Sequence, residues 1–341
     1  MIFRSKAPLR LGLAGGGTDV SPYSDIYGGA ILNATVSLYA SAHIELLEKP
    51  VIELQTLDRN EQEFFPRTHE LPVNGKLDLL KGVYNRIQKD FGIETTGFRL
   101  STHVDAPAGS GLGTSSTLVV AIIGAFAEML KLPLGEYDIA HYAYEIERND
   151  LQLAGGKQDQ YAATFGGVNF MEFYENDKVI VNPLRIKQEY LNELGNNLLL
   201  YFTATSRESA TIIKEQQKNV RNQNEQSIEA MHLLKEQARR MKEALLKGRL
   251  HEIGEILDYG FQQKRKMAAN ISNSLMDTIY ETAQKAGASG GKISGAGGGG
   301  FMIFYCPGNT RFNVMKALEP FGGVFRNYEF TNQGLTTWTA Q

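Results

Sequence analysis

The first half of the chain alternates apolar and polar positions in several short runs. The run over residues 30–48 predicts a half-buried strand or a bent pair of strands, and residues 51–57 and 97–104 predict further strands. Residues 77–91 and 138–153 instead space their apolar side chains by three and four positions, as amphipathic helices do. Because helices follow several strands without alternating strictly with them, we expect an α+β fold and not a doubly wound sheet.

The second half shows more helical periodicity. Apolar residues recur at three- and four-residue steps over 227–247, which predicts a long amphipathic helix that ends at Gly248. A further helix is expected from an N-cap at Ser274 to Ala286. The many charged side chains of the long helix are most simply a solvated face.

Length and composition indicate a globular protein that is long enough for two domains or one large one. The chain has 341 residues, of which 42% are hydrophobic and 21% are charged. We expect two domains with a boundary in residues 180–195, around the Pro183 turn, and divide the chain into residues 1–188 and 189–341. A net charge of −3 with no basic block argues against a nucleic-acid partner.

We expect a cytoplasmic protein with no membrane partner. The N-terminal residues lack a continuous apolar signal core, and the longest apolar run, 118–127, is far short of the ~20 residues that cross a bilayer. The single cysteine, Cys306, lies in an apolar run and is expected in the core, which suits a reducing compartment.

Glycines gather in clusters, and the one at residues 107–120, PAGSGLGTSSTLVV, has a clear physical interpretation. Its glycines let backbone N–H groups approach a ligand closely, and Thr114 then begins an apolar helix whose N-terminus favours phosphate. The loop has no lysine, so it is not the GxxxxGK[ST] phosphate loop, and it lacks dinucleotide GxGxxG spacing. The alternative is a capped glycine turn before a core helix.

The second cluster lies within residues 7–23, and the third within residues 292–305. In the second, Arg10 offers a fixed cation for phosphoryl oxygens, and Asp19 can accept hydrogen bonds from sugar hydroxyls. An ordinary ion pair and a turn cap are equally compatible with these two residues. Ordering the glycines of the third cluster is entropically costly, so we favour a functional loop over a flexible linker there.

Acidic residues between these clusters have the chemistry that phosphoryl transfer needs. Asp159 is expected on irregular chain, between glycine pairs, where catalytic residues often lie. Glu147, on the preceding helix, is a candidate ligand for a hard cation such as Mg²⁺, together with a hydroxyl of the phosphate loop. Helix phase does not separate Glu147 from Glu145. Taken alone, these acidic residues are better explained as surface acids on a helix and a loop.

Taken together, these segments resemble the GHMP kinase superfamily. Residues 107–115 match its P-x-G-x-G-L-G-[ST]-[ST] motif throughout, and KAPLRLGLAGGGTD and KISGAGGGGFMI resemble its N- and C-terminal motifs. The resemblance covers nearly the whole chain. It implies an N-terminal domain like ribosomal protein S5 domain 2, a C-terminal ferredoxin-like domain and an active site between them.

The resemblance also implies roles for individual residues in an ATP- and Mg²⁺-dependent reaction. Asp159 corresponds to the catalytic base, and Arg10 to the basic residue near the transferred group. Ser115 and Glu147 correspond to the Mg²⁺ ligands. The expected nucleotide-binding residues are Pro107, Gly109, Gly111, Leu112, Gly113, Thr114, Ser115 and Ser116. The expected substrate-binding residues are Gly16, Gly17, Thr18, Asp19, Gly297 and Gly298.

The N-terminal glycine motif narrows the range of expected substrates. GLAGGGTDV departs from the Gly-Glu-His-Thr-Asp of galactokinase, and the longer form is closer to the bacterial D-glycero-D-manno-heptose 7-phosphate kinases. Those enzymes phosphorylate the anomeric 1-hydroxyl of a small-molecule sugar phosphate and make the 1,7-bisphosphate for nucleotide-activated heptose. The L-fucose kinase branch has a similar opening. A substrate that already carries phosphate needs a basic or N–H-rich pocket, for which Lys157, Ser206 and Arg207 are candidates.

Other function classes fit less well. A non-catalytic sugar or nucleotide sensor on the same scaffold would have no use for a base, so the combination of Arg10, Glu147 and Asp159 argues against it. A nicotinamide-dependent oxidoreductase lacks its GxGxxG spacing. The pattern leaves the oligomeric state open.

Overall fold

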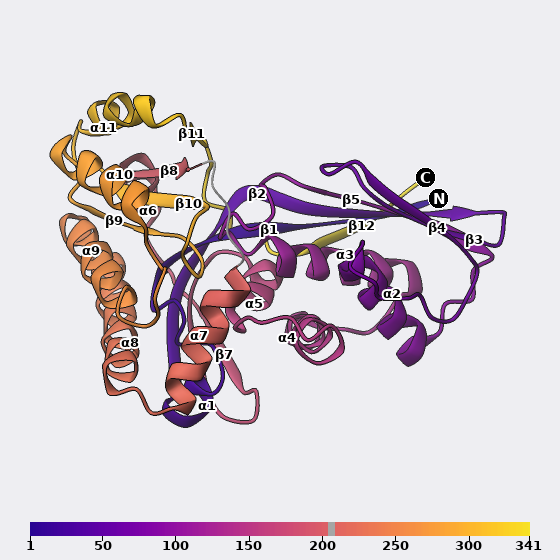
Figure 1. Ribbon diagram of the computed structural model, residues 1–341. Helices are drawn as coiled ribbons and strands as arrows, with labels where there is room; N and C mark the ends of the chain where they lie inside the picture. The colour runs from indigo at the N-terminus through magenta and orange to yellow at the C-terminus, as the bar shows by residue number, and fades with distance from the viewer. Residues whose placement is uncertain (204–208) are drawn as a thin grey trace.

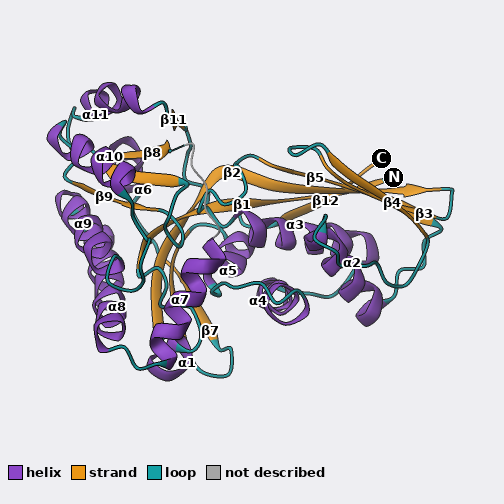
Figure 2. Cartoon of the chain, in the orientation of Figure 1, coloured by secondary structure: helices purple, strands orange, loops and turns teal. Residues whose placement is uncertain are grey.

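The computed structural model describes residues 1–203 and 209–341. Within them, strands form a large sheet in the order β12-β1-β2-β5-β3-β4, with β6 paired to β2 and β7 paired to β6 (Figure 2). The pairing of β3 with β5 is parallel and the others are antiparallel. These strands are β1 (Ile2–Ala14), β2 (Gly29–Leu47), β3 (Val51–Thr56), β4 (Glu61–Pro66), β5 (Gly97–Val104), β6 (Val168–Phe173), β7 (Val179–Pro183) and β12 (Thr336–Ala340).

A smaller antiparallel sheet has the order β11-β8-β10-β9. Its strands are β8 (Leu198–Phe202), β9 (Gly290–Ile293), β10 (Phe301–Tyr305) and β11 (Val324–Phe325). The helices of the first half are α1 (Tyr23–Tyr27), α2 (Asp78–Phe91), α3 (Thr114–Leu130), α4 (Glu136–Glu145), the π-helix η1 (Ile146–Asp150) and α5 (Gln158–Phe165). Those of the second half are α6 (Gln188–Asn197), α7 (Ser209–Arg221), α8 (Glu225–Leu246), η2 (Leu250–Glu252), α9 (Ile253–Lys264), α10 (Ser274–Lys285), α11 (Arg311–Leu318) and η3 (Glu319–Phe321).

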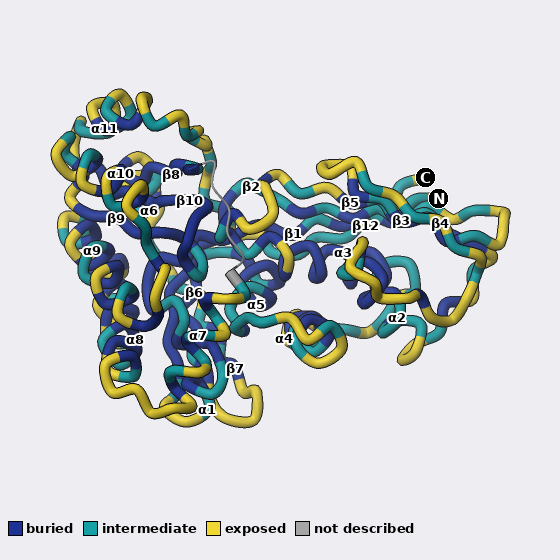
Figure 3. The backbone as a smooth tube through the Cα atoms, viewed as in Figure 1, coloured by how far each residue is buried: buried dark blue, intermediate teal, exposed yellow. Residues whose placement is uncertain are grey.

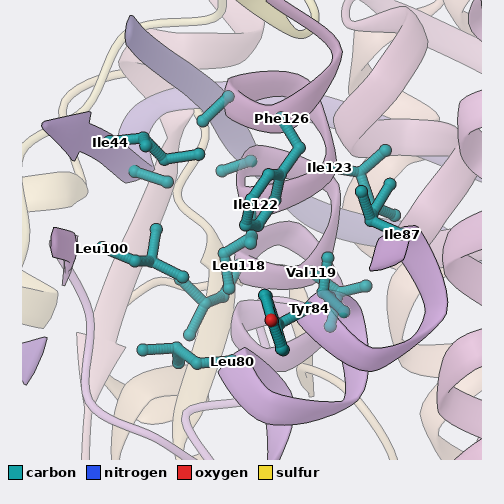
Figure 4. Close-up of a cluster of buried hydrophobic side chains, with 14 of the residues drawn as sticks. Ile44, Leu80, Tyr84, Ile87, Leu100, Leu118, Val119, Ile122, Ile123 and Phe126 are labelled. Atoms are coloured by element: carbon teal, nitrogen blue, oxygen red, sulfur yellow. The ribbon is translucent and has the colours of Figure 1, made fainter. Parts of the chain in front are cut away.

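Helix α3 is the buried centre of the first half. It is apolar on nearly all sides and packs between the large sheet and α2, where Leu118, Ile122 and Phe126 are enclosed (Figure 4). A second core joins the two halves, since it contains side chains of β1 and β2 together with α8, α9, β8 and β10. Figure 3 shows most of β1 and all of β10 in the colour of buried residues. The glycine loop before α3 is therefore anchored to the most buried helix of this half.

The α+β prediction is confirmed, and most predicted elements are present. The run over 30–48 is one long strand, β2, and the long amphipathic helix is α8. Gly248 has the left-handed φ of 67° expected after it. The predicted N-cap at Ser274 is wrong by one residue, because the side chain of Asn273 accepts the hydrogen bond from the Met276 amide.

Other expectations need correction or stay open. The helix predicted over 138–153 begins as α4 but continues as the π-helix η1. The division into residues 1–188 and 189–341 stays a prediction, and β12 does not follow it, because this last strand pairs with β1 (Figure 1). Cys306 is fully buried, as expected. Within the described ranges, no helix is both long and apolar enough to span a membrane.

Candidate active site

A cavity of about 690 Å³ lies where the two halves meet. Its walls come from the glycine loop before α3, the turn after β1, η1 and the start of α5. The second half adds α7, the end of α9 and the loop before β10. The cavity therefore gathers segments of all three glycine clusters, although they lie far apart in the sequence.

The glycine loop has the geometry that its sequence predicts. Gly109, Gly111 and Gly113 have φ of 71°, 82° and 79°, which other residues rarely adopt. A Cβ on Gly111 would lie 2.4 Å from the Ser294 carbonyl oxygen, so the third glycine cluster packs directly against the loop. This packing argues against a free linker there. Ser115 is exposed at the cavity wall, at the N-terminus of α3.

Some predicted nucleotide-binding side chains point elsewhere. Leu112 is fully buried in the core shared by the two halves, and Pro107 is exposed outside the cavity lining. Only the backbone of Leu112 is available to the site, and its carbonyl accepts the amide of Arg10 at 3.1 Å. Thr114 and Ser116 line the cavity.

Arg10 and Asp159 form an ion pair beside the loop. The Arg10 Nε donates to Asp159 Oδ1 at 2.7 Å, and its Nη1 donates to the Gly111 carbonyl at 2.7 Å. Arg10 is 3% exposed, whereas the Asp159 side chain is 24% exposed and faces the cavity. A Cβ on Gly113 would lie 3.1 Å from Asp159 Cγ, so the carboxylate lies against the loop. This cavity combines a cation, a carboxylate and a helix N-terminus.

The expectation that Asp159 lies on irregular chain is wrong. It is the second residue of α5, whose start is capped by Asp19. Glycines 155 and 156 precede the helix because neighbouring side chains leave no room for a Cβ; one on Gly156 would lie 1.9 Å from Asp19 Oδ2. The helix holds the Asp159 backbone in a fixed position against the loop.

Glu145 is the last residue of α4 and Glu147 lies in η1, and their side chains face different directions. Glu147 is 2% exposed and lines the cavity, where its Oε2 accepts from the amide of Gln160. That amide also donates to Ser116 Oγ at 3.1 Å. Glu145 instead pairs with Arg86 at 2.9 Å on the outer side. Residues two positions apart on a helix face different directions.

The donor set suits a hard cation. A buried carboxylate (Glu147) and an exposed hydroxyl (Ser115) line one cavity. The described residues contain no group of three or more His, Cys, Asp or Glu side chains arranged for a metal ion. Mg²⁺ commonly takes one or two protein carboxylates and fills its remaining positions with phosphate and water. Glu147 and Ser115 fit that pattern.

Asp19 combines the two roles that its sequence position leaves open. Its Oδ2 accepts from the amides of Lys157 and Gln158 at 2.9 and 3.0 Å and so caps α5. Its Oδ1 is buried and has no hydrogen-bond partner in the described part of the chain. Burial raises the pKa of this carboxyl, although the Gln158 amide opposes that shift. A carboxylate oxygen in a cavity wall is an acceptor suited to a ligand hydroxyl.

The other predicted substrate residues divide into two groups. Gly17 lines the cavity, whereas Gly16 and Thr18 do not; Thr18 is buried and donates to the Gly15 carbonyl at 2.8 Å. Gly297 and Gly298 pack against Ile271 and do not line the cavity; the Gly298 amide donates to the Ile271 carbonyl at 2.9 Å. The third cluster instead contributes its neighbours, which are Gly295 and Ala296.

The candidate Lys157 does not suit a phosphate. Its Nζ lies 2.7 Å from Asp177 and 3.4 Å from Asp25, away from the cavity lining. Burial opposes its charge, but the bond with Asp177 and the neighbouring Tyr144 and Asp25 raise its pKa. The other two candidates, Ser206 and Arg207, lie outside the described residues.

Sequence reasoning missed several polar residues in the wall of this cavity or directly behind it. Gln160 lies one residue after Asp159 and holds Glu147, yet its side chain carries no charge that would single it out. Lys264 and Gln216 line the cavity and are 3% and 1% exposed, although both come from helices whose polar residues are typical of a solvent face. Only tertiary packing distinguishes them from solvated neighbours.

Comparison with known proteins agrees with this geometry. Residues 78–167 match the GHMP kinases N terminal domain, and residues 241–320 match the GHMP kinases C terminal domain. The chain is 48% identical over 335 residues to the D-glycero-alpha-D-manno-heptose 7-phosphate kinase of Campylobacter jejuni, covering 98% of both chains.

Solved structures of kinases are similar to this chain as well. A D-glycero-D-manno-heptose 1-phosphate kinase from Bacteroides thetaiotaomicron is 45% identical, with a TM-score of 0.85 over 99% of both chains. The mevalonate kinase of Methanococcus jannaschii is 20% identical, with a TM-score of 0.76 over 97% of this chain and 98% of that one, and it shares the fold.

Proposed function

The chain belongs to the GHMP kinase family, and from this premise we propose that it is an ATP-dependent sugar kinase. Its substrate would be D-glycero-D-manno-heptose 7-phosphate, phosphorylated at the anomeric 1-hydroxyl to give the 1,7-bisphosphate. The observation that carries the proposal is the Arg10–Asp159 ion pair, 2.7 Å long, held against the glycine loop inside the cavity. A sequence identity of 48% to a heptose 7-phosphate kinase supports this substrate.

In the proposed reaction, the glycine loop, Asp159 and Arg10 each have a separate role. Amides between Gly109 and Ser115 bind the β- and γ-phosphates of ATP at the start of α3. The oxygen of the sugar 1-hydroxyl attacks the γ-phosphorus, and the Asp159 carboxylate accepts the proton of that hydroxyl. The bond between that phosphorus and the β–γ bridging oxygen breaks, and ADP leaves. Arg10 offsets the charge that develops on the transferring group.

Glu147 and Ser115 would hold Mg²⁺, which when bound neutralises phosphate charge. Gln160 fixes the orientation of Glu147 and bridges it to Ser116 at the start of α3. Asp19 would accept sugar hydroxyls through its free Oδ1. We further propose that the protein acts in the cytoplasm, since its substrates would be ATP and a phosphorylated sugar.

Replacing Glu147 by alanine is expected to raise the Mg²⁺ concentration needed for half-maximal turnover by at least about tenfold, because a carboxylate ligand is lost. Titration of the initial rate with Mg²⁺ at saturating ATP measures this shift. The matched control is Glu145→Ala, which removes the acid paired with Arg86. A larger shift in the control than in Glu147→Ala would assign the metal ligand to Glu145.

A coupled assay of ADP release tests the proposed function. Heptose 7-phosphate, L-fucose, galactose and mannose are compared at equal concentrations, and the 1-phosphate is identified by ³¹P NMR. We expect the highest kcat/KM with heptose 7-phosphate. A higher value with fucose would assign the chain to the fucose kinase branch, and no sugar-dependent ADP release would support a sensor.

A further inference from the structure

Several buried polar groups beside the turn that ends at Asp19 lack a hydrogen-bond or ion-pair partner. Oδ1 of Asp19 and Nε2 of Gln216 have no hydrogen-bond partner among residues 1–203 and 209–341. Lys264 donates to the Gly295 carbonyl, and no carboxylate of the described chain forms an ion pair with it. These side chains are 2%, 1% and 3% exposed, and all line the cavity. Because unsatisfied buried polar groups are costly, a ligand that completes them is expected here.

The side chains of Lys264 and Gln216 face this turn from the other half of the chain. A Cβ on Gly16 would lie 3.7 Å from Lys264 Nζ, and one on Gly17 would lie 3.6 Å from Gln216 Oε1. Lys264 ends α9 and Gln216 lies in α7, whereas the turn follows β1. An ammonium and an amide therefore border the same recess as the free oxygen of Asp19.

The charge balance of the recess favours an anion. Arg10 also faces the recess, whereas Lys292, whose Nζ would lie 4.0 Å from a Cβ on Gly16, has a pKa that burial, Lys264 and Arg10 lower well below its ordinary value. Asp159 is paired with Arg10, and Asp19 caps α5. Burial and, to a smaller extent, Arg10 lower the pKa of Lys264 to about 8, although Asp19 and Asp159 oppose the shift. The ammonium is thus still mostly protonated at neutral pH.

We propose that Lys264 and Gln216 bind the phosphate group that the sugar already carries and thereby select phosphorylated over unphosphorylated sugars. This inference rests on the proposed function. The sugar hydroxyls donate to Asp19, and the phosphate oxygens accept from Lys264 and Gln216. The transferring group is served separately by the glycine loop and Arg10, which lie on the Asp159 side of the cavity.

The test compares kcat/KM for D-glycero-D-manno-heptose 7-phosphate with that for the unphosphorylated heptose. Loss of a charge-assisted hydrogen bond in Lys264→Met is expected to lower the first value about 30- to 100-fold and the second far less. Gln216→Leu is expected to show a preference about tenfold smaller than the wild type. Lys266→Met is the matched control, because Lys266 is exposed two residues farther along and does not line the cavity.

Equal losses with both sugars would overturn the inference and assign Lys264 to the transferring group. An unchanged preference in Lys264→Met would overturn it as well. Folding is checked by thermal unfolding at pH 7, where Lys264→Met should unfold no earlier than the wild type, because it removes a buried cation that has no acid partner.

The inference can be separated from the proposed function by calorimetry without nucleotide. Heptose 7-phosphate is titrated into the wild type and Lys264→Met. If the wild type releases no ADP with any sugar but binds this ligand at least about tenfold more tightly than the variant, the proposed function fails and the inference stands. Equal binding, or no binding to either protein, overturns the inference.

Discussion

Replacing Asp159 by asparagine is expected to lower kcat about 10²- to 10⁴-fold, because the site loses the group that accepts the hydroxyl proton. The dissociation constant of ATP should change less than about threefold, since the phosphates contact loop amides and not this carboxylate. Steady-state assays of ADP release measure kcat, and calorimetry with a non-hydrolysable ATP analogue measures the dissociation constant.

Asp150→Asn is the control for this variant. Asp150 is an acid of η1 that pairs with Arg86 and does not line the cavity. Its substitution should leave kcat within about twofold of the wild type, as surface ion pairs contribute little. Turnover by Asp159→Asn at the wild-type rate would remove Asp159 from the reaction.

Replacing Arg10 by methionine is expected to lower kcat/KM about 10²- to 10³-fold. A preorganised buried cation that stabilises transition-state charge has effects of this size. Arg10 is 3% exposed and bridges Asp159 to the Gly111 carbonyl, so its loss affects both the base and the loop. Arg10→Lys should recover only part of the activity, because one ammonium does not reproduce the planar fork of the guanidinium.

The kcat and KM of these variants distinguish charge stabilisation from a general loss of structure. The larger part of the loss should appear in kcat, while circular dichroism stays that of the wild type. Arg4→Met, on the same strand β1 but outside the cavity lining, serves as the control. A loss confined to the KM of ATP would show that Arg10 only binds nucleotide.

Local physical chemistry explains why much of this site could be predicted from the sequence. The loop at 109–115 and its conformation were predictable, because consecutive residues carry the whole signal. This signal consists of glycines with positive φ followed by the start of an apolar helix. Strand alternation likewise identified β2, β3 and β5. The choice between Glu147 and Glu145 was not predictable, since it depends on which face of this helical segment packs toward the cavity, and the π-helical turn has no periodic signal.

The remaining errors concern contacts between distant segments. Lys157 lies two residues before the predicted base in the sequence. Its ammonium group nevertheless forms ion pairs with Asp25 and Asp177 away from the cavity. Lys264 is buried only because α9 packs against the shared core, and β12 joins the first sheet only through long-range pairing with β1. Such contacts depend on the tertiary arrangement of segments and leave no pattern in neighbouring residues.

A crystal structure with a non-hydrolysable ATP analogue, Mg²⁺ and D-glycero-D-manno-heptose 7-phosphate tests the central claim most directly. The account predicts the β- and γ-phosphates on the amides of residues 109–115, and the 1-hydroxyl of the sugar within hydrogen-bonding distance of the Asp159 carboxylate. A loop that holds no phosphate, or a 1-hydroxyl remote from Asp159, would contradict it.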